Sequence, residues 1–100
     1  MIVVVGYLTI NPDLRGEVEA AIATLVPLTT AEDGNIEYRY SVDMGEPNRI
    51  NIMEQWESEE AMNAHMGTTH LADFMTVMGG AIGGPLEIIR YDVASSTKIF

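Results

Sequence analysis

The feature that most constrains this chain is its opening run, MIVVVGYLTI, which predicts a β-strand with two apolar faces. β-Branched residues dominate residues 2–10, and side chains alternate between the faces of a strand. One face would carry Ile2, Val4, Leu8 and Ile10, and the other Val3, Val5 and Tyr7. An inner strand that is covered on both sides has this composition. The run is too short to span a bilayer and has no basic start, so we expect neither a membrane segment nor a signal peptide.

The rest of the chain predicts two helical regions and three further strands, all within one domain that covers residues 1–100. The first predicted helix begins at Asn11-Pro12 and is ended by Pro27 and the polar segment Thr29–Gly34. It is followed by strands over 35–43 and 49–56, a helix after Ser58 that is interrupted at Gly67–Thr69, a loop over Gly79–Pro85 and a strand over 86–94. The order βαββαβ indicates a ferredoxin-like α+β fold, in which both helices cover one face of a four-stranded antiparallel sheet.

The bare face of such a sheet would expose the second apolar face of the first strand. A chain of 100 residues has no further element that could cover it. Because a large exposed apolar surface is unfavourable in water, a second copy of the chain is the simplest cover. The sequence therefore predicts a homodimer that forms through the sheet face.

Charge and composition exclude several classes of function. The formal net charge is −10, and the five basic residues are scattered along the chain: Arg15, Arg39, Arg49, Arg90 and Lys98. Nucleic acids and anionic membranes require clustered basic groups, so we expect neither as a partner. The absence of cysteine excludes disulfides, thiol nucleophiles and thiolate metal sites. We expect a cytoplasmic protein.

The segment Glu54–Phe74 contains the only tryptophan and both histidines. Glu54 would lie on the same face of its strand as Ile52 and Trp56, pointing toward the helices. A carboxylate on a buried face needs a partner, and His65, His70 or Arg90 could supply one. Such a contact would either tether the helix to the strand or orient a histidine that acts as a general base.

Two alternatives remain open for each histidine. His65 could make a helix-to-sheet contact and His70 could cap the second helical piece, or either could be a general base, because the imidazole pKa lies near 7. Five residues correspond to about 140° around a helix axis, which is a poor arrangement for two metal ligands. The break at Gly67 could bring the two rings together, but no third ligand is evident, so we expect no metal site.

A ligand pocket between the helices and the sheet would have soft, apolar walls. The expected lining residues are Gly6, Ile52, Trp56, Met62, Met66 and Phe74. Gly6, as the smallest residue on an inner strand, would leave room above it. Trp56 could be a wall of this pocket or part of the core.

Two motifs resemble those of the antibiotic biosynthesis monooxygenase (ABM) family, and within it the quinol-monooxygenase-like branch. The first is E-x-W-x8-H-x4-H, formed by Glu54, Trp56, His65 and His70 and followed by an aromatic residue, Phe74. The second is the run from Glu32 to Tyr40, which is similar to the E-x-G-N-x-x-Y hairpin motif of that family. The resemblance covers nearly the whole chain and implies a dimeric α/β barrel.

The resemblance implies a cofactor-independent monooxygenase that acts with O2 on a quinol-like or polyphenolic small aromatic, with His65 or His70 as the base and Glu54 behind it. Members that oxygenate anthrones have an asparagine and a tyrosine at the positions of Ile52 and Met62, so that substrate is not expected. The haem-degrading branch differs at Gly6, His65 and Met75, so no haem turnover is expected. The alternatives are a non-redox isomerase of a small metabolite and a non-catalytic dimeric ligand-binding module.

Overall fold

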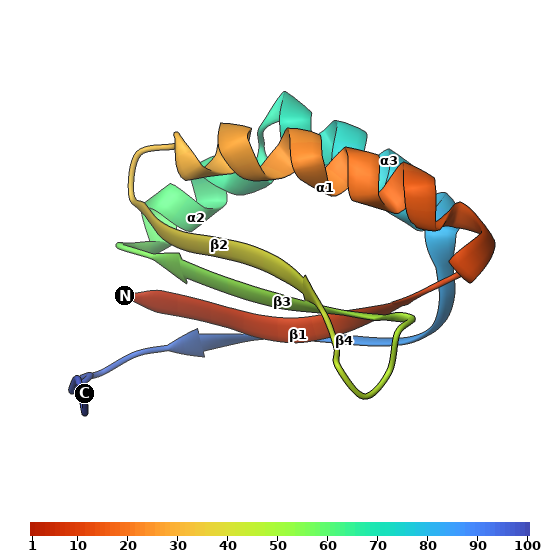
Figure 1. Cartoon of the computed structure of the whole chain (residues 1–100). Helices are drawn as coiled ribbons and strands as arrows, with labels where there is room; N and C mark the ends of the chain where they lie inside the picture. The colour runs from red at the N-terminus through yellow and green to blue at the C-terminus, as the bar shows by residue number, and fades with distance from the viewer.

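The computed structural model describes residues 1–100 as a four-stranded antiparallel sheet with all helices on one face (Figure 1). The strands are β1 (Ile2–Ile10), β2 (Asn35–Val42), β3 (Arg49–Trp56) and β4 (Ile82–Asp92). A short 3-10 turn, Pro12–Leu14, precedes the helices α1 (Arg15–Thr30), α2 (Glu59–Met66) and α3 (Thr69–Ala81). The predicted ferredoxin-like fold is confirmed. No helix combines the length and the apolar character needed to cross a bilayer.

The sheet order β2-β3-β1-β4 places β1 inside the sheet, as its two apolar faces predict. Val4 and Leu8 of β1 are buried under the helices, whereas Val5, on the opposite face, is 45% exposed. The helices close the core with one stripe from α1, which includes Val18 and Leu25, and one from α3. The α3 residues of the core are Leu71, Phe74, Met78 and Ala81.

The predicted interruption of the second helix is also confirmed, and each of the two resulting helices has a capped N-terminus. Ser58 Oγ accepts a hydrogen bond from the Ala61 N–H at 3.1 Å and begins α2. Thr68 Oγ1 accepts from the Leu71 N–H at 3.4 Å and begins α3. The same hydroxyl donates to the carbonyl oxygen of His65 at 2.7 Å, so it joins the end of α2 to the start of α3.

Of the two predicted end signals of the first helix, Pro27 was wrong and the polar segment Thr29–Gly34 was confirmed, because α1 runs through Pro27 and ends at Thr30. Proline inside a helix removes one hydrogen bond and is unfavourable on local grounds. Here the last turn packs into the core, since Leu25 and Thr29 are both buried. Thr30 Oγ1 also donates to the Pro27 carbonyl at 3.1 Å, which satisfies an acceptor near the helix end. Tertiary packing therefore outweighs the local signal.

The loop predicted over Gly79–Pro85 was also wrong, because α3 runs to Ala81 and β4 begins at Ile82. The Asn11 N–H donates to the Ala81 carbonyl at 2.7 Å, so the end of α3 lies against the end of β1. A Cβ atom on Gly83 would lie 2.8 Å from the Asn11 nitrogen. Gly83 therefore permits a close backbone approach within β4, and Gly79 and Gly80 belong to α3.

The room expected above Gly6 is filled by the backbone of β4. A Cβ atom at this position would lie 2.2 Å from the Glu87 carbonyl oxygen and 2.6 Å from the Ile88 Cα. Gly6 pairs with Ile88 in the β1–β4 register, so the small residue allows the two strands to approach closely. Gly6 thus has a structural role in the sheet.

Gly6→Ala should lower the free energy of unfolding by about 1–3 kcal/mol, because the added methyl group overpacks the β1–β4 contact. Gly16→Ala is the matched control, since a Cβ atom there meets nothing within 4 Å and Gly16 lies in α1. Chemical denaturation of both variants measures the difference. Equal stabilities for the two variants would contradict this account of Gly6.

Candidate active site

The turn after α1 places Glu32 beside the break between α2 and α3. The Glu32 N–H donates to the Thr29 carbonyl at 3.0 Å, and the Asn35 N–H donates to the Glu32 carbonyl at 3.3 Å. Between them Gly34 has a φ of 81°, in the left-handed region that glycine adopts at little cost. The predicted Asp33-Gly34 turn therefore fixes the backbone that carries the Glu32 side chain.

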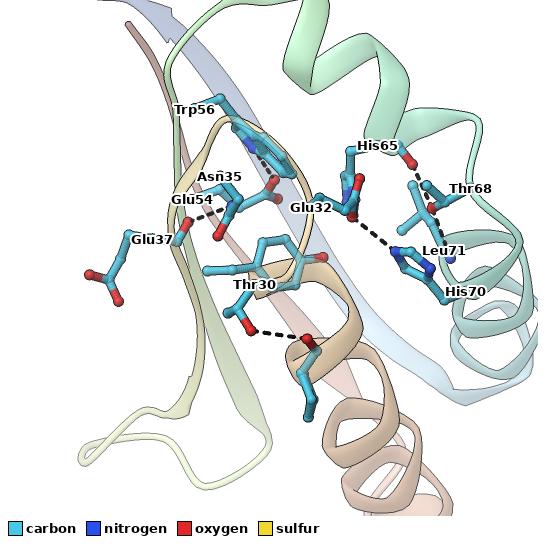
Figure 2. A network of polar contacts seen from close by, with 12 residues as sticks. Thr30, Glu32, Asn35, Glu37, Glu54, Trp56, His65, Thr68, His70 and Leu71 are labelled. Atoms are coloured by element: carbon cyan, nitrogen blue, oxygen red, sulfur yellow. Dashed lines mark hydrogen bonds and ion pairs between the residues drawn. The ribbon is translucent and has the colours of Figure 1, made fainter.

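A single carboxylate oxygen of Glu32 contacts both histidines (Figure 2). Glu32 Oε2 lies 2.7 Å from His65 Nδ1 and 2.9 Å from His70 Nε2. His65 is 2% exposed, whereas the side chains of Glu32 and His70 are 14% and 20% exposed. The carboxylate thereby joins the turn before β2 to both α2 and α3.

The Gly67 break does bring the two histidines together, and Glu32 is the group that the sequence analysis missed. One nitrogen from each ring and one Glu32 oxygen lie within 4.8 Å of one another. The expectation of no metal site rested on the lack of an evident third ligand, and Glu32 supplies such a group. Imidazole nitrogen and carboxylate oxygen are suitable ligands for zinc and for other divalent transition metals.

The prediction that Glu54 pairs with a histidine or with Arg90 was wrong. Glu54 Oε1 accepts a hydrogen bond from Trp56 Nε1 at 2.9 Å (Figure 2). Arg90 instead donates to Asp92 Oδ1 at 2.8 Å. Burial raises the pKa of the Glu54 carboxyl, and the hydrogen bond from Trp56 opposes that shift. Glu54 is thus a partly desolvated carboxyl group with one oxygen engaged.

Aromatic rings surround His65 on the sheet side. The centroid of the His65 ring lies 4.8 Å from that of Trp56 and 5.3 Å from that of Tyr38. The hydroxyl oxygens of Tyr38 and Tyr40 are 3.3 Å apart. Burial raises the pKa of Tyr40 to about 12 and also raises the pKa of Tyr38. Both phenols therefore stay protonated near neutral pH and can donate hydrogen bonds.

A cavity of about 500 Å³ lies between the sheet and the α2–α3 pair. This volume is within the range of small-molecule sites. Most of its wall is apolar, and the polar groups on the wall come from Tyr38, Tyr40, Glu54, His65 and Arg90. The cavity therefore presents a few polar side chains to an otherwise apolar interior.

The structure brings most of the predicted site residues to this cavity. Its lining includes Ile52, Glu54, Met62, His65, Met66 and Phe74. Trp56 is fully buried and contacts Glu54 and His65 without lining the cavity, and Gly6 and His70 do not line it either. Of the two histidines, only His65 can therefore meet a ligand in the cavity as the structure stands.

One signal in the sequence pointed to Glu32. It is the first residue of the E-x-G-N-x-x-Y motif, which ends at Tyr38, a neighbour of His65. The motif predicts a hairpin and by itself indicates no role for its glutamate. The contact with His65 joins residues 33 positions apart, so no local pattern announces it.

Comparison with known proteins identifies the family of this chain. Residues 1–77 match the family model described as antibiotic biosynthesis monooxygenase. The chain belongs to the ABM family. A curated relative, "Putative monooxygenase YcnE" of Bacillus subtilis, is 31% identical over 94 residues, which cover 94% of this chain and 99% of YcnE.

Solved structures of similar fold come from several bacteria. A putative antibiotic biosynthesis monooxygenase from Deinococcus radiodurans has a TM-score of 0.88 and 20% identity, with coverage of 100% of this chain and 99% of that chain. Another from Nitrosomonas europaea has a TM-score of 0.86 and 18% identity, with coverage of 95% and 100%. At these identities the similarity shows that the ABM fold is shared.

Glu32→Ala should destabilise this ABM protein by about 1–3 kcal/mol, because it leaves the buried Nδ1 of His65 without a partner. Asp33→Ala is the matched control: Asp33 is exposed, so a change of less than about 0.5 kcal/mol is expected. Urea denaturation of both variants gives the comparison. A Glu32→Ala variant as stable as Asp33→Ala would show that the carboxylate does not hold the helices.

Proposed function

We propose that this protein is a cofactor-independent monooxygenase that acts on a quinol-like or polyphenolic small aromatic, with His65 as the general base. The observation that carries the proposal is the position of His65. One of its nitrogens contacts a carboxylate, and the residue lines a largely apolar cavity of about 500 Å³. Membership of the ABM family supports an oxygenase reaction.

The contact with Glu32 sets the tautomer of His65. An ionised carboxylate is only an acceptor, so Nδ1 of His65 must carry the proton of their 2.7 Å hydrogen bond. The lone pair of a neutral imidazole is then on Nε2, the nitrogen that has no partner in the protein. This is the tautomer that a general base requires, and Glu32 is placed to stabilise the imidazolium that forms.

The chemistry proposed here starts with the transfer of a phenolic proton to His65 Nε2. The electron-rich phenolate then reacts with O2; one oxygen atom enters the ring and the other leaves as water, with the substrate supplying the electrons. Tyr38 and Tyr40 stay protonated and hydrogen-bond each other, which leaves one hydroxyl proton of the pair free to donate to an anion in the cavity. The apolar wall excludes water from the anion.

We also propose that the protein works as a homodimer through the bare face of the sheet. All helices lie on the opposite face (Figure 1). The bare face carries apolar side chains that are exposed in the single chain, among them Val5, Ile89 and Tyr91. Covering such a surface with a second copy would bury it from water.

His65→Asn should reduce kcat for oxygen uptake by about 100-fold or more with either of two substrates, 4-tert-butylcatechol or a reduced menadione-type quinol, because it removes the base. The asparagine amide can still reach toward Glu32, so the fold should be retained. His70→Gln is the matched control, since its amide can replace His70 Nε2 at Glu32 and His70 does not line the cavity. An oxygen electrode, with subtraction of autoxidation, makes the measurement.

Three outcomes would contradict this proposal. The first is wild-type oxygen uptake no faster than autoxidation, which would favour a ligand-binding module. The second is an equal loss in both histidine variants. The third is loss of activity after treatment with a chelator and recovery with a divalent metal, which would assign Glu32, His65 and His70 to a metal site.

Val5→Glu should convert the protein from a dimer to a monomer, because symmetry would place the new charges in a shared apolar interface. Leu28→Glu is the matched control, since Leu28 is 48% exposed but lies in α1, away from the bare face. Sedimentation velocity at micromolar concentration measures the state of each variant. A stable, folded wild-type monomer would refute the dimer.

A further inference from the structure

Two polar atoms at the cavity wall have no partner in the protein. Glu54 Oε1 is engaged by Trp56 and His65 Nδ1 by Glu32, but neither Glu54 Oε2 nor His65 Nε2 makes a hydrogen bond. Both residues line the cavity. The one buried side-chain polar atom without a partner is Thr29 Oγ1, so these two atoms are not sealed inside the protein. They are available to a molecule in the cavity.

Trp56 holds these two groups at the same end of the cavity. Its Nε1 donates to Glu54 at 2.9 Å, and its ring centroid lies 4.8 Å from that of His65. The indole is fully buried, so it cannot change its position freely. Elsewhere the cavity wall is formed mainly by apolar side chains such as Phe74, Met78 and Ile88.

We propose that Glu54 determines substrate specificity by accepting a hydrogen bond from a second hydroxyl group, adjacent to the hydroxyl that loses its proton to His65. The inference rests on the proposed function, because it places the reacting hydroxyl at His65. Among quinol-like and polyphenolic aromatics, the site then selects those with two neighbouring hydroxyl groups at one end of an apolar body. A ligand with one hydroxyl leaves Glu54 Oε2 without a partner, which weakens binding.

The test compares two ligands that differ by one hydroxyl group, 4-tert-butylcatechol and 4-tert-butylphenol. Isothermal titration calorimetry without oxygen measures the dissociation constant of each. We expect the wild-type protein to bind the catechol at least about tenfold more tightly, because hydrogen bonds to charged groups are strong. In Glu54→Gln this ratio should fall at least threefold, because an amide N–H then faces the cavity. The phenol should bind Glu54→Gln at least as tightly as the wild-type protein, because no carboxylate oxygen is then left without a partner.

Glu57→Gln is the matched control, since Glu57 is an exposed carboxylate on the same segment and should keep the wild-type ratio. A second measurement needs no variant. The protein has one tryptophan, so its single indole N–H resonance reports on the hydrogen bond to Glu54. That resonance should shift with the catechol and move little with the phenol.

Several results would overturn the proposal: no catechol binding, a wild-type ratio below tenfold, a Glu54→Gln ratio within threefold of the wild-type ratio, or an indole resonance that responds equally to both ligands. Both binding measurements are made without oxygen, so they do not depend on turnover. A protein that selects the catechol but consumes no oxygen would therefore refute the oxygenase function and leave the role of Glu54 intact.

Discussion

The pairing of β1 with both β3 and β4 is the constraint on which the rest of the structure depends. Val4 lies opposite Glu54 on one side and opposite Arg90 on the other, and Tyr38 pairs with Glu54 from the edge strand. These pairings place the side chains of Tyr38, Glu54 and Arg90 in one row on the helix-covered face. A slip of one residue in the β1–β3 register would turn Glu54 toward the bare face and remove it from the cavity.

The sequence predicts the parts of the fold that local periodicity determines. The two-faced apolar pattern of residues 2–10 places β1 inside the sheet, and Ser58 marks where α2 begins. The cap of α3 was not predicted, because it is Thr68 and not His70. The errors occur where tertiary contacts override a local signal. Pro27 stays inside α1 because the following turn packs into the core. Gly83 lies in β4 because the backbone at Asn11 approaches it closely.

The candidate site was less predictable, for reasons that differ between its two glutamates. Glu54 could be placed by alternation along β3, but its partner proved to be Trp56, two residues further along the same face. Glu32 could not be placed, because its contacts with His65 and His70 cross 33 and 38 positions. Apart from its place in the turn motif, no feature of the neighbouring sequence distinguishes Glu32 from the other acidic residues.

The two glutamates lie near the same imidazole but in different environments, and this difference divides their roles. Glu32 Oε2 is the shared partner of both histidines, and its contact with Nδ1 fixes the His65 ring. Glu54 is turned toward an apolar cavity that raises its pKa, and one of its oxygens remains free for a ligand.

A ligand that fills the cavity would strengthen the electrostatic interaction between Glu32 and His65. An aromatic ligand displaces water, and electrostatic interactions grow as the local dielectric constant falls. An imidazolium at His65 would then have less solvent around it, but the Glu32 carboxylate already lies 2.7 Å from Nδ1. No side chain has to move when the charge appears, and such preorganisation is what makes fixed charges effective in catalysis. Glu32, in the turn before β2, holds α2 through His65 and α3 through His70. Its hydrogen bond to His65 would therefore both fix the helix and stabilise the charged base.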